Sequence, residues 1–443
     1  MHNLAIALKN QGHEVTGSDD HLFDPSKGRL EKEGLLPEET GWFPERIHQG
    51  LDAVIVGMHA KTGNPELEQA KALSLKLYSY PEFIHQHATN QQRIVVAGSH
   101  GKSTVSSMIL HVLQSLGRNF DYVVGAVPKT LETTVRLSEK APLIIIEGDE
   151  YPTSPLDPTP KFLKYQHHIG IITGIAWDHY NVYPDYGQYV EQFRRFAEAT
   201  PKAGALVYDK SDKTLDKLIK KGGVREDVLQ LPYALPKHKI KSGETVLSGE
   251  GNPVPIRVFG EHNLLNLAAA LEVCQRIGIK KEEFYKAIAT FEGARLRLEL
   301  LKEGTNGAKV YRDFAHAPSK VKATVEAVKK QVGKQPLVAC VELHTYSSLN
   351  KSFIGQYKDS LKKADTAMVY YNPETVARKE LSPIKEKELQ EAFNQQDLKV
   401  FTDKEELAKN LVSEGAGRST VLLMSSGNFD GLELNKLAED IAP

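Results

Sequence analysis

The chain has 443 residues, enough for about two to four domains with buried cores. Its 56 Lys and Arg residues nearly balance its 57 Asp and Glu residues, which excludes a global basic field for nucleic acid or anionic lipid. No stretch approaches the ~18–20 apolar residues of a membrane-spanning helix. Cys274 and Cys340 lie far apart, outside any CxxC spacing. These features predict a soluble protein of the reducing cytoplasm, with no membrane or nucleic-acid partner.

Residues 1–89 are typical of a small α/β unit. A short amphipathic helix opens the chain and ends at Gly12, a strand is expected from Val15, and a second apolar strand covers residues 51–56. Units of this kind normally begin with a strand and a glycine-rich loop before their first helix. We therefore expect that about 10–15 residues of the usual unit, a strand and a turn, are missing upstream.

Two polar, turn-rich segments predict the domain boundaries, at residues 85–92 and near residue 298. The predicted domains are residues 1–89, 90–297 and 298–443. In the third, three short apolar runs are each followed by helix-like sequence, which predicts a parallel sheet flanked by helices. These runs are residues 336–343, 365–371 and 419–426. The predicted fold class is α/β.

The strongest chemical signal is GSHGKST at residues 98–104, between an apolar strand and a helix with an apolar face. A phosphate-binding loop needs glycines that let backbone N–H groups surround phosphate, a lysine that neutralises the β and γ charge, and a hydroxyl that holds Mg²⁺. Gly101, Lys102 and Ser103 supply these groups, although Val96 stands where the longer GxxxxGK[ST] pattern has glycine. The residues predicted to bind a nucleotide are Gly98, Ser99, His100, Gly101, Lys102, Ser103 and Thr104.

Acidic side chains follow the next apolar strand. Glu147, Asp149 and Glu150 stand at its end, and in a phosphate-loop sheet the acid at a neighbouring strand end contacts Mg²⁺. We select Glu147 as the metal ligand; alternatively, the acids simply end a buried strand at the surface. A later apolar run delivers Asp178 and His179 to a comparable strand end, where ligands bind in sheets of this class.

Six segments occur in the order and approximate spacing of the Mur ligase family, which the chain resembles over essentially its whole length. The segments are GSHGKST, EGDE at 147–150, WDH at 177–179, GEHNLLN at 260–266, FEGARLRLE at 291–299 and RDFAHAP at 312–318. The resemblance implies a Rossmann-like N-terminal domain for a UDP-linked acceptor, a central ATPase, and a Rossmann-like C-terminal domain for the incoming amine. It also implies ATP-dependent amide formation through an acyl phosphate.

Within the family, residues 26–34, 148–185 and 424–431 most resemble the branch that joins UDP-N-acetylmuramate to a murein tripeptide in peptidoglycan recycling. No lysine lies between Lys164 and Lys202, so the carbamylated lysine of some relatives has no counterpart, which agrees with the subgroup of the family that acts on UDP-N-acetylmuramate itself. L-alanine as the amine donor is the alternative within the family. A nucleotide-binding sensor that does not ligate is the alternative of another class. Monomer and homodimer both stay open.

The resemblance assigns roles to single residues. Lys102, His179 and Arg297 would be catalytic. Ser103 and Glu147 would hold the Mg²⁺ that bridges ATP, and His179 a second Mg²⁺. Asn263 would contact the nucleotide, Arg297 the γ-phosphate and Asp313 the ribose. Taken singly, Asn263 could cap a helix beginning at Leu264, Arg297 could be a surface residue and Asp313 could end a strand.

Further residues are expected at the substrates. Ser18, Asp19 and His59 are the candidates that the resemblance leaves for the UDP end of the acceptor. Just before the DH turn at 178–179, Gly174 and Ala176 replace an asparagine and a glutamate that relatives often carry among their substrate and metal contacts. For the amine donor, polar side chains after two C-terminal strands would supply hydroxyl, amide and ammonium groups, or could belong to ordinary hydroxyl-rich loops. They are Ser347, Asn350, Lys351, Ser426 and Asn428.

Overall fold

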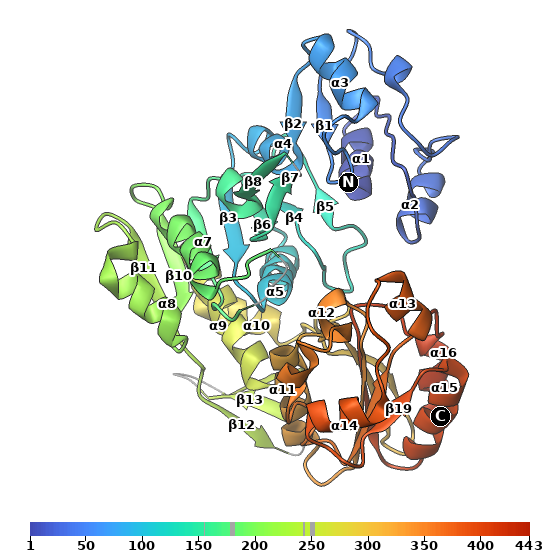
Figure 1. The fold of residues 1–443 in the computed structure, drawn as a ribbon. Helices are drawn as coiled ribbons and strands as arrows, with labels where there is room; N and C mark the ends of the chain where they lie inside the picture. Colours follow the sequence, from blue (N-terminus) through green and yellow to red (C-terminus); the bar gives the residue numbers. More distant parts are fainter. Residues whose placement is uncertain (155, 178–181, 242–243, 249–252) are drawn as a thin grey trace. The chain divides into compact units, whose positions relative to one another are not determined.

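The computed structural model describes residues 1–154, 156–177, 182–241, 244–248 and 253–443. The chain divides into two compact units (Figure 1). The first holds residues 1–177, 182–234 and 269–281, and the second holds the described residues of 235–268 together with 282–443. No helix of the described part of the chain is long and apolar enough to cross a membrane.

A small parallel sheet lies in the N-terminal part of the first unit, where β1 (Val54–Val56) pairs with β2 (Leu77–Ser79). The predicted opening helix is confirmed. The strand expected from Val15 is wrong: residues 13–19 form no regular structure, since this mostly polar stretch pairs with no strand of the described residues. The helices of this part are α1 (His2–Asn10), α2 (Ser26–Lys32), η1 (Pro44–Arg46), α3 (Pro65–Ala72) and α4 (Tyr80–His87).

A seven-stranded sheet forms the centre of the first unit. Its strands are β3 (Gln92–Ala97), β4 (Asp121–Val123), β5 (Val135–Arg136), β6 (Leu143–Glu147), β9 (Ile169–Ile172), β10 (Ala205–Asp209) and β11 (Leu229–Tyr233). Their order is β11-β10-β9-β3-β6-β4-β5. All neighbours are parallel except β5, which is antiparallel to β4. The carboxyl ends of β3, β6 and β9 therefore meet at one edge.

Helices cover this sheet because side chains alternate between its faces. Val95 and Ala97 of β3 pack in one cluster with Tyr189, Phe193 and Phe196 of α7 (Tyr186–Glu198). Each fully buried side chain of this size stabilises the fold by about 1.5–3 kcal/mol. The other elements of this part are α5 (Lys102–Ser115), β7 (Pro152–Ser154), β8 (Asp157–Pro160), α6 (Lys161–Lys164), α8 (Lys213–Leu218) and η2 (Ile219–Gly223).

The second unit is built on a six-stranded sheet. Its strands are β15 (Glu299–Glu303), β16 (Lys309–Asp313), β17 (Leu337–Glu342), β18 (Thr366–Tyr370), β19 (Lys399–Phe401) and β20 (Thr420–Met424). They lie in the order β15-β16-β20-β17-β18-β19, and only β15 is antiparallel to its neighbour. The three predicted apolar runs are β17, β18 and β20, which confirms the parallel sheet expected here.

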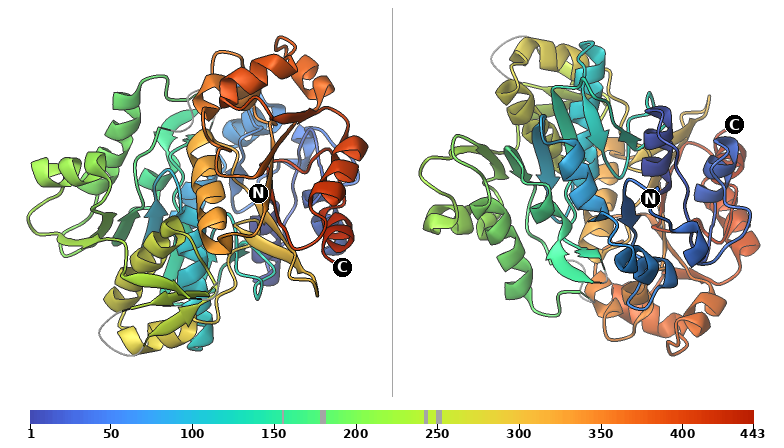
Figure 2. Two further views of the ribbon diagram at one scale, coloured as in Figure 1. Left: turned by 90° about the horizontal axis from the view of Figure 1, so that it is seen from below. Right: turned by 90° about the horizontal axis from the view of Figure 1, so that it is seen from above.

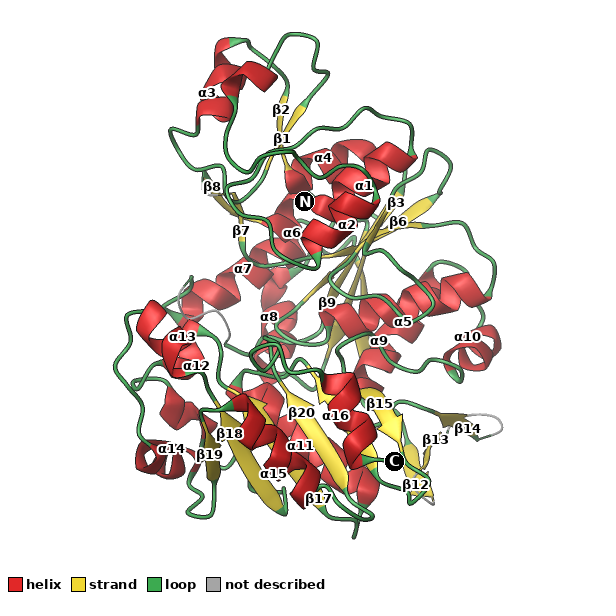
Figure 3. Ribbon diagram, turned by 90° about the vertical axis from the view of Figure 1, so that its right-hand side faces the viewer, coloured by secondary structure: helices red, strands yellow, loops and turns green. Residues whose placement is uncertain are grey.

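Both faces of this second sheet are covered by helices. Leu337 and Ala339 of β17 pack in one cluster with α11 (Pro318–Val332). Val338 and Cys340, which alternate with them, pack in another with α15 (Lys404–Glu414) and α16 (Leu434–Ile441). Figure 2 (left) shows α11 in orange and the red helices on opposite sides of the strands, and Figure 3 shows α15 and α16 in front of them. Such a two-sided cover is typical of parallel sheets.

Shorter elements complete the chain. A three-stranded antiparallel sheet joins β12 (His238–Lys241), β13 (Glu244–Leu247) and β14 (Val254–Ile256). The remaining helices are α9 (Glu261–Arg276), α10 (Lys281–Ile288), α12 (Tyr346–Leu349), η3 (Ile354–Tyr357), α13 (Pro373–Arg378) and α14 (Glu386–Phe393).

Candidate active site

The predicted phosphate loop connects β3 to α5 at the carboxyl edge of the central sheet. Gly98 has φ +128°, and a Cβ added there would lie 2.1 Å from Thr173 Oγ1 and 2.8 Å from Thr173 N. Gly101, with φ +83°, is the residue before α5. Both positions favour glycine because other residues rarely adopt these angles. The loop is thus packed against the end of β9 and leads directly into a helix N-terminus, where backbone N–H groups attract anions.

Ser99 holds the loop to its surroundings. Its backbone N–H donates to Gly174 O at 3.0 Å, and its hydroxyl accepts from Ala176 N at 2.8 Å. The Tyr189 hydroxyl of α7 lies 3.1 Å from Ser99 Oγ. Gly174 and Ala176, which depart from the family pattern, therefore contribute through their backbones. His100 takes part through its carbonyl, which accepts from Thr173 Oγ1.

Lys102 lies at the start of α5 and is almost fully enclosed. Its ammonium donates to Gly98 O at 2.7 Å and lies 3.0 Å from Glu150 Oε2. Burial disfavours the charged form of Lys102, but Glu150, Asp149 and Glu147 outweigh burial and raise its pKa above the usual value. Lys102 is therefore a fixed positive charge at the position where the motif predicts phosphate.

Glu150 is a part of this site that sequence reasoning missed. It is 0% exposed, and its Oε1 lies 3.1 Å from the Tyr189 hydroxyl. The Tyr183 hydroxyl donates to the Glu150 carbonyl. The sequence shows a run of acidic residues after β6, but it does not show which of them contacts Lys102.

Glu147 and Ser103 form the candidate metal-binding pair. Strand pairing places Glu147 of β6 opposite Val96 of β3, so its carboxylate reaches the start of α5. Ser103 Oγ donates to Glu147 Oε1 at 2.7 Å, and Gly125 N donates to Oε2 at 2.7 Å. Burial and the charge of Asp149 raise the pKa of Glu147, against the opposing effect of Lys102. A hydroxyl and a carboxylate are donors that suit Mg²⁺.

Thr104 is buried in α5. His179 and Asp178 lie outside the described residues. Trp177, just before them, donates from Nε1 to Tyr183 O at 3.0 Å.

Arg297 and Asp313 come together in the second unit. Asp313 ends β16, and its carboxylate accepts from Leu298 N at 2.5 Å and from Ala315 N at 2.7 Å. Burial raises the pKa of Asp313, while Arg297 and the two N–H groups favour its charged form. The Arg297 guanidinium lies 4.5 Å from the centre of the Phe314 ring. The segment 296–298 is therefore anchored to the end of β16.

Asn263 lies inside the first turns of α9. The helix begins at Glu261 rather than Leu264, so the capping role considered for Asn263 is wrong. Its Nδ2 donates to Phe259 O at 2.9 Å. Burial lowers the pKa of the adjacent His262, against the opposing charge of Asp313.

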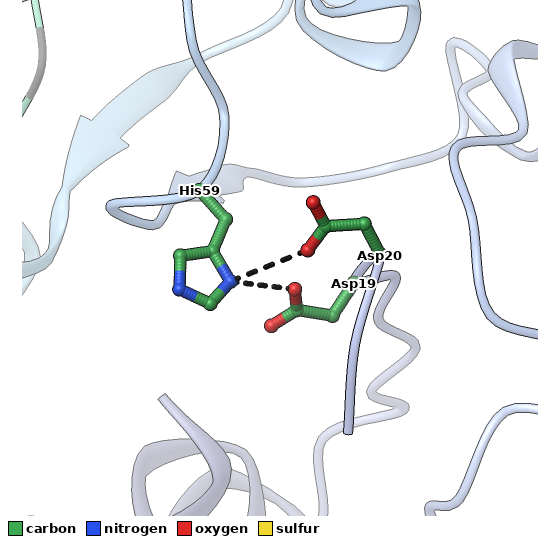
Figure 4. A group of neighbouring side chains, drawn as sticks. All are labelled: Asp19, Asp20 and His59. Atoms are coloured by element: carbon green, nitrogen blue, oxygen red, sulfur yellow. Dashed lines mark hydrogen bonds and ion pairs between the residues drawn. The ribbon is translucent and has the colours of Figure 1, made fainter. Parts of the chain in front are cut away.

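The N-terminal candidates form a small polar cluster, in which Figure 4 shows two carboxylates turned toward one imidazole nitrogen. His59 Nδ1 lies 2.7 Å from Asp19 Oδ1 and 3.6 Å from Asp20 Oδ1. Asp20 was not predicted. Ser18 precedes the cluster and is half-buried. The pairing with Asp19 orients the imidazole of His59.

The candidates for the amine donor lie in two segments of the second unit. Lys351 pairs with Glu388 at 2.7 Å, and Asn350 Oδ1 accepts from Ser352 N at 2.9 Å. Ser347 is half-buried in α12. After β20, Asn428 Oδ1 accepts from Gly431 N at 3.1 Å. The hydroxyl of Ser426 is buried and has no hydrogen-bond partner within the described ranges.

Glu342 organises the second of these segments and was also missed. It ends β17, is 3% exposed, and accepts from Phe429 N at 2.9 Å and from the Ser425 hydroxyl. His344 Nδ1 lies 3.8 Å from its other oxygen. An acid at the end of an apolar strand was the available signal, the same one that selected Glu147.

Comparison with known proteins gives matches along the chain. The Mur ligase middle domain matches residues 96–274, and the Mur ligase glutamate ligase domain matches residues 296–427. A UDP-N-acetylmuramate–L-alanyl-γ-D-glutamyl-meso-2,6-diaminoheptandioate ligase of Escherichia coli K12 is 30% identical over 100% of this chain and 96% of its own. A UDP-N-acetylmuramate–L-alanine ligase of Caldicellulosiruptor bescii is 29% identical over 83% of this chain and 80% of its own.

A solved structure shares the fold. The crystal structure of a murein peptide ligase from Psychrobacter arcticus 273-4 matches with a TM-score of 0.66 at 21% identity, over 99% of this chain and 96% of that one. The predicted α/β architecture of the Mur ligases is thereby confirmed, while the boundaries of the three domains stay a prediction. From the two matching domains and the full-length relative, it follows that the chain belongs to the Mur ligase family.

Proposed function

We propose that the chain is an ATP-dependent ligase that joins the carboxylate of UDP-N-acetylmuramate to the amine of the murein tripeptide L-alanyl-γ-D-glutamyl-meso-diaminopimelate, in peptidoglycan recycling. The observation that carries the proposal is the 30% identity, over the whole chain, to a relative named for these two substrates. The clustering of Lys102, Ser103 and Glu147 at one edge of a parallel sheet supports the use of ATP.

The reaction needs an activated acyl group because a carboxylate resists attack by an amine. A carboxylate oxygen attacks the γ-phosphorus, ADP leaves, and an acyl phosphate forms. The amine then attacks the carbonyl carbon, and phosphate leaves with that carboxylate oxygen. Positioning and neutralisation of charge dominate such steps. Lys102 neutralises phosphate charge, and the loop N–H groups at the start of α5 hold the phosphate oxygens.

Ser103 and Glu147 are the residues of the described chain that would hold Mg²⁺. When bound, the ion would neutralise phosphate charge. Hydrogen bonds from Ser103 and Gly125 fix the Glu147 carboxylate beside the phosphate loop. His179 is proposed for a second Mg²⁺ from the family resemblance alone.

Residues of the second unit are proposed for the remaining contacts of ATP. Arg297 would meet the γ-phosphate, Asp313 the ribose and Asn263 the nucleotide. Two backbone N–H groups hold the Asp313 carboxylate in place, so its orientation is set before a ligand arrives.

The substrate contacts follow the same reasoning. Ser18, Asp19 and His59 are proposed for the UDP end of the acceptor. Ser347, Asn350, Lys351, Ser426 and Asn428 are proposed for the tripeptide, whose carboxylates and ammonium group need polar partners.

L-alanine ligation is the second candidate, favoured by the match to the C. bescii enzyme over 83% of the chain. ADP release should be measured with ATP, Mg²⁺ and UDP-N-acetylmuramate, with the tripeptide or L-alanine offered separately and the product mass recorded. The proposal expects release that depends on the tripeptide, a product of the summed masses less water, and none of either with Lys102→Met. Turnover with L-alanine alone would select the second candidate. ADP release without any ligated product would select a nucleotide hydrolase or sensor.

A further inference from the structure

A cavity lies at the opposite edge of the central sheet from the phosphate loop. It has a volume of about 440 Å³ and is formed where three neighbouring strands begin, at Gln92 of β3, Ile169 of β9 and Ala205 of β10. The phosphate loop follows the other end of β3. The volume lies within the ~300–1,000 Å³ that small-molecule sites occupy.

The cavity wall is positively charged. Lys202, from the turn before β10, and Arg276, the last residue of α9, both line it, and no Asp or Glu is among its lining residues. Neither side chain has a hydrogen bond or ion pair within the described ranges. Asp227, whose charge reaches Lys202, is paired with Arg225 at 2.6 Å and does not line the cavity. Both cations are therefore available to a ligand.

Neutral donors and close backbone packing complete the wall. Gln92 contributes an amide, while the Thr89 hydroxyl donates to the Gln86 carbonyl. His168 is held in place because its Nδ1 accepts from Arg93 N at 3.0 Å. Burial, together with the charge of Arg93, lowers the pKa of His168, so the ring is neutral at neutral pH. A Cβ added to Gly204 would lie 2.9 Å from the His168 carbonyl, which shows how closely the turn with Lys202 approaches β9.

We propose that this cavity binds a small molecule that carries several negative charges, such as a phosphorylated or polycarboxylic acid. Lys202 and Arg276 would neutralise the anion, with Arg276 able to make paired hydrogen bonds to phosphate or carboxylate oxygens. The amide of Gln92 would donate to a remaining oxygen. The site is separate from the phosphate loop because it lies at the amino ends of the same strands.

Calorimetric titration with two probes, 3-phosphoglycerate and citrate, tests the proposal on the full chain. The double variant Lys202→Ala/Arg276→Ala removes both cations of the cavity. The matched control Arg118→Ala/Lys217→Ala removes the same charge from two exposed residues of the same unit. We expect at least one probe to bind the wild type, with affinity about tenfold weaker in the cavity variant and unchanged in the control. Binding of 3-phosphoglycerate but not citrate would indicate that the cavity recognises phosphate. Binding of citrate would indicate that carboxylates are sufficient.

Hydrogen exchange locates the binding and covers the case in which the double variant fails to fold. In the wild type, a bound probe should slow amide exchange in residues 89–92 and 201–205. A Lys102→Met variant, altered at the phosphate loop, should keep the binding. Three results would overturn the proposal: neither probe binds the wild type, both double variants lose affinity equally, or binding disappears with Lys102→Met and protection falls on residues 98–104 instead.

Discussion

Lys102 Nζ lies 3.0 Å from Glu150 Oε2, so the lysine of the phosphate loop is paired with a fully buried carboxylate. Tyr189 contacts the same carboxylate and Ser99 of the loop. This arrangement joins α5, the segment after β6, and α7 around one ammonium group. Glu150 therefore fixes the position of Lys102 before any phosphate contact is made.

Replacing Glu150 with glutamine should destabilise the first unit. Glu150→Gln keeps the size of the side chain but removes the charge that faces Lys102, and we expect the free energy of unfolding to fall by about 1–3 kcal/mol. Urea denaturation measures the change. Glu139→Gln, at an exposed position, should stay within about 0.5 kcal/mol of the wild type. Equal effects of the two substitutions would show that the Lys102–Glu150 pair contributes nothing.

Replacing Gly98 with alanine should disrupt the phosphate loop. The added Cβ would overlap Thr173, whose backbone nitrogen lies only 2.8 Å away. We expect Gly98→Ala to lower the free energy of unfolding by at least the ~1–3 kcal/mol of a strained backbone position and to abolish ADP release. Gly222→Ala is the matched control, because Gly222 has φ +89° but nothing within 4 Å of its added Cβ. A Gly98→Ala variant no less stable than Gly222→Ala would contradict the packing of the loop on β9.

The sequence predicts those residues of the site that lie close together along the chain. The strand, glycine-rich loop and helix of residues 92–115 are contiguous, and Glu147 follows from the rule that ligands gather at the carboxyl edge of a parallel sheet. The contact of Glu150 with Tyr189 joins residues 39 positions apart, and Tyr189 to Ser99 spans 90 positions. Spacing along the chain cannot show such contacts, because they depend on how α7 packs on the sheet.

The fold is predicted with similar limits. Strands β17, β18 and β20 are uninterrupted apolar runs, and the sequence indicates them directly. The strand expected from Val15 does not form. Val15 is a single apolar residue in a polar stretch, and this stretch pairs with no strand of the described residues. Short edge strands such as β5 and β19 have two and three residues, too few for a periodic pattern.

Magnesium dependence should change with pH because Glu147, as the proposed ligand, would bind the ion only when ionised. Burial and Asp149 raise the pKa of Glu147, so acidification protonates it at a higher pH than an ordinary carboxyl of pKa about 4.3. The Mg²⁺ concentration for half-maximal ADP release should therefore rise as the pH falls toward that raised pKa. In Glu147→Gln this concentration should be higher throughout and nearly independent of pH. A wild type whose Mg²⁺ requirement is flat over the same range would remove Glu147 from the metal site.

Replacing Glu342 with glutamine should weaken the binding of the amine donor without weakening the binding of ATP. Glu342 accepts from Phe429 N and the Ser425 hydroxyl, and these bonds hold the segment that carries Ser426 and Asn428. We expect Glu342→Gln to raise KM for the tripeptide by about tenfold or more, the effect of roughly 1.4 kcal/mol, with KM for ATP unchanged. Steady-state kinetics with each substrate varied gives both constants, and Glu439→Gln, at an exposed position of α16, is the control. A parallel rise in both KM values would indicate general loss of structure instead.

The acyl phosphate is the central claim of the proposed reaction, and isotope transfer tests it most directly. UDP-N-acetylmuramate labelled with ¹⁸O in its carboxylate is turned over with ATP, Mg²⁺ and the tripeptide, and the phosphate released is analysed by mass spectrometry. Because one carboxylate oxygen leaves with the phosphoryl group, each phosphate formed from doubly labelled substrate should carry one ¹⁸O. Amide product formed with unlabelled phosphate, or with the label in AMP, would contradict phosphoryl transfer to the carboxylate.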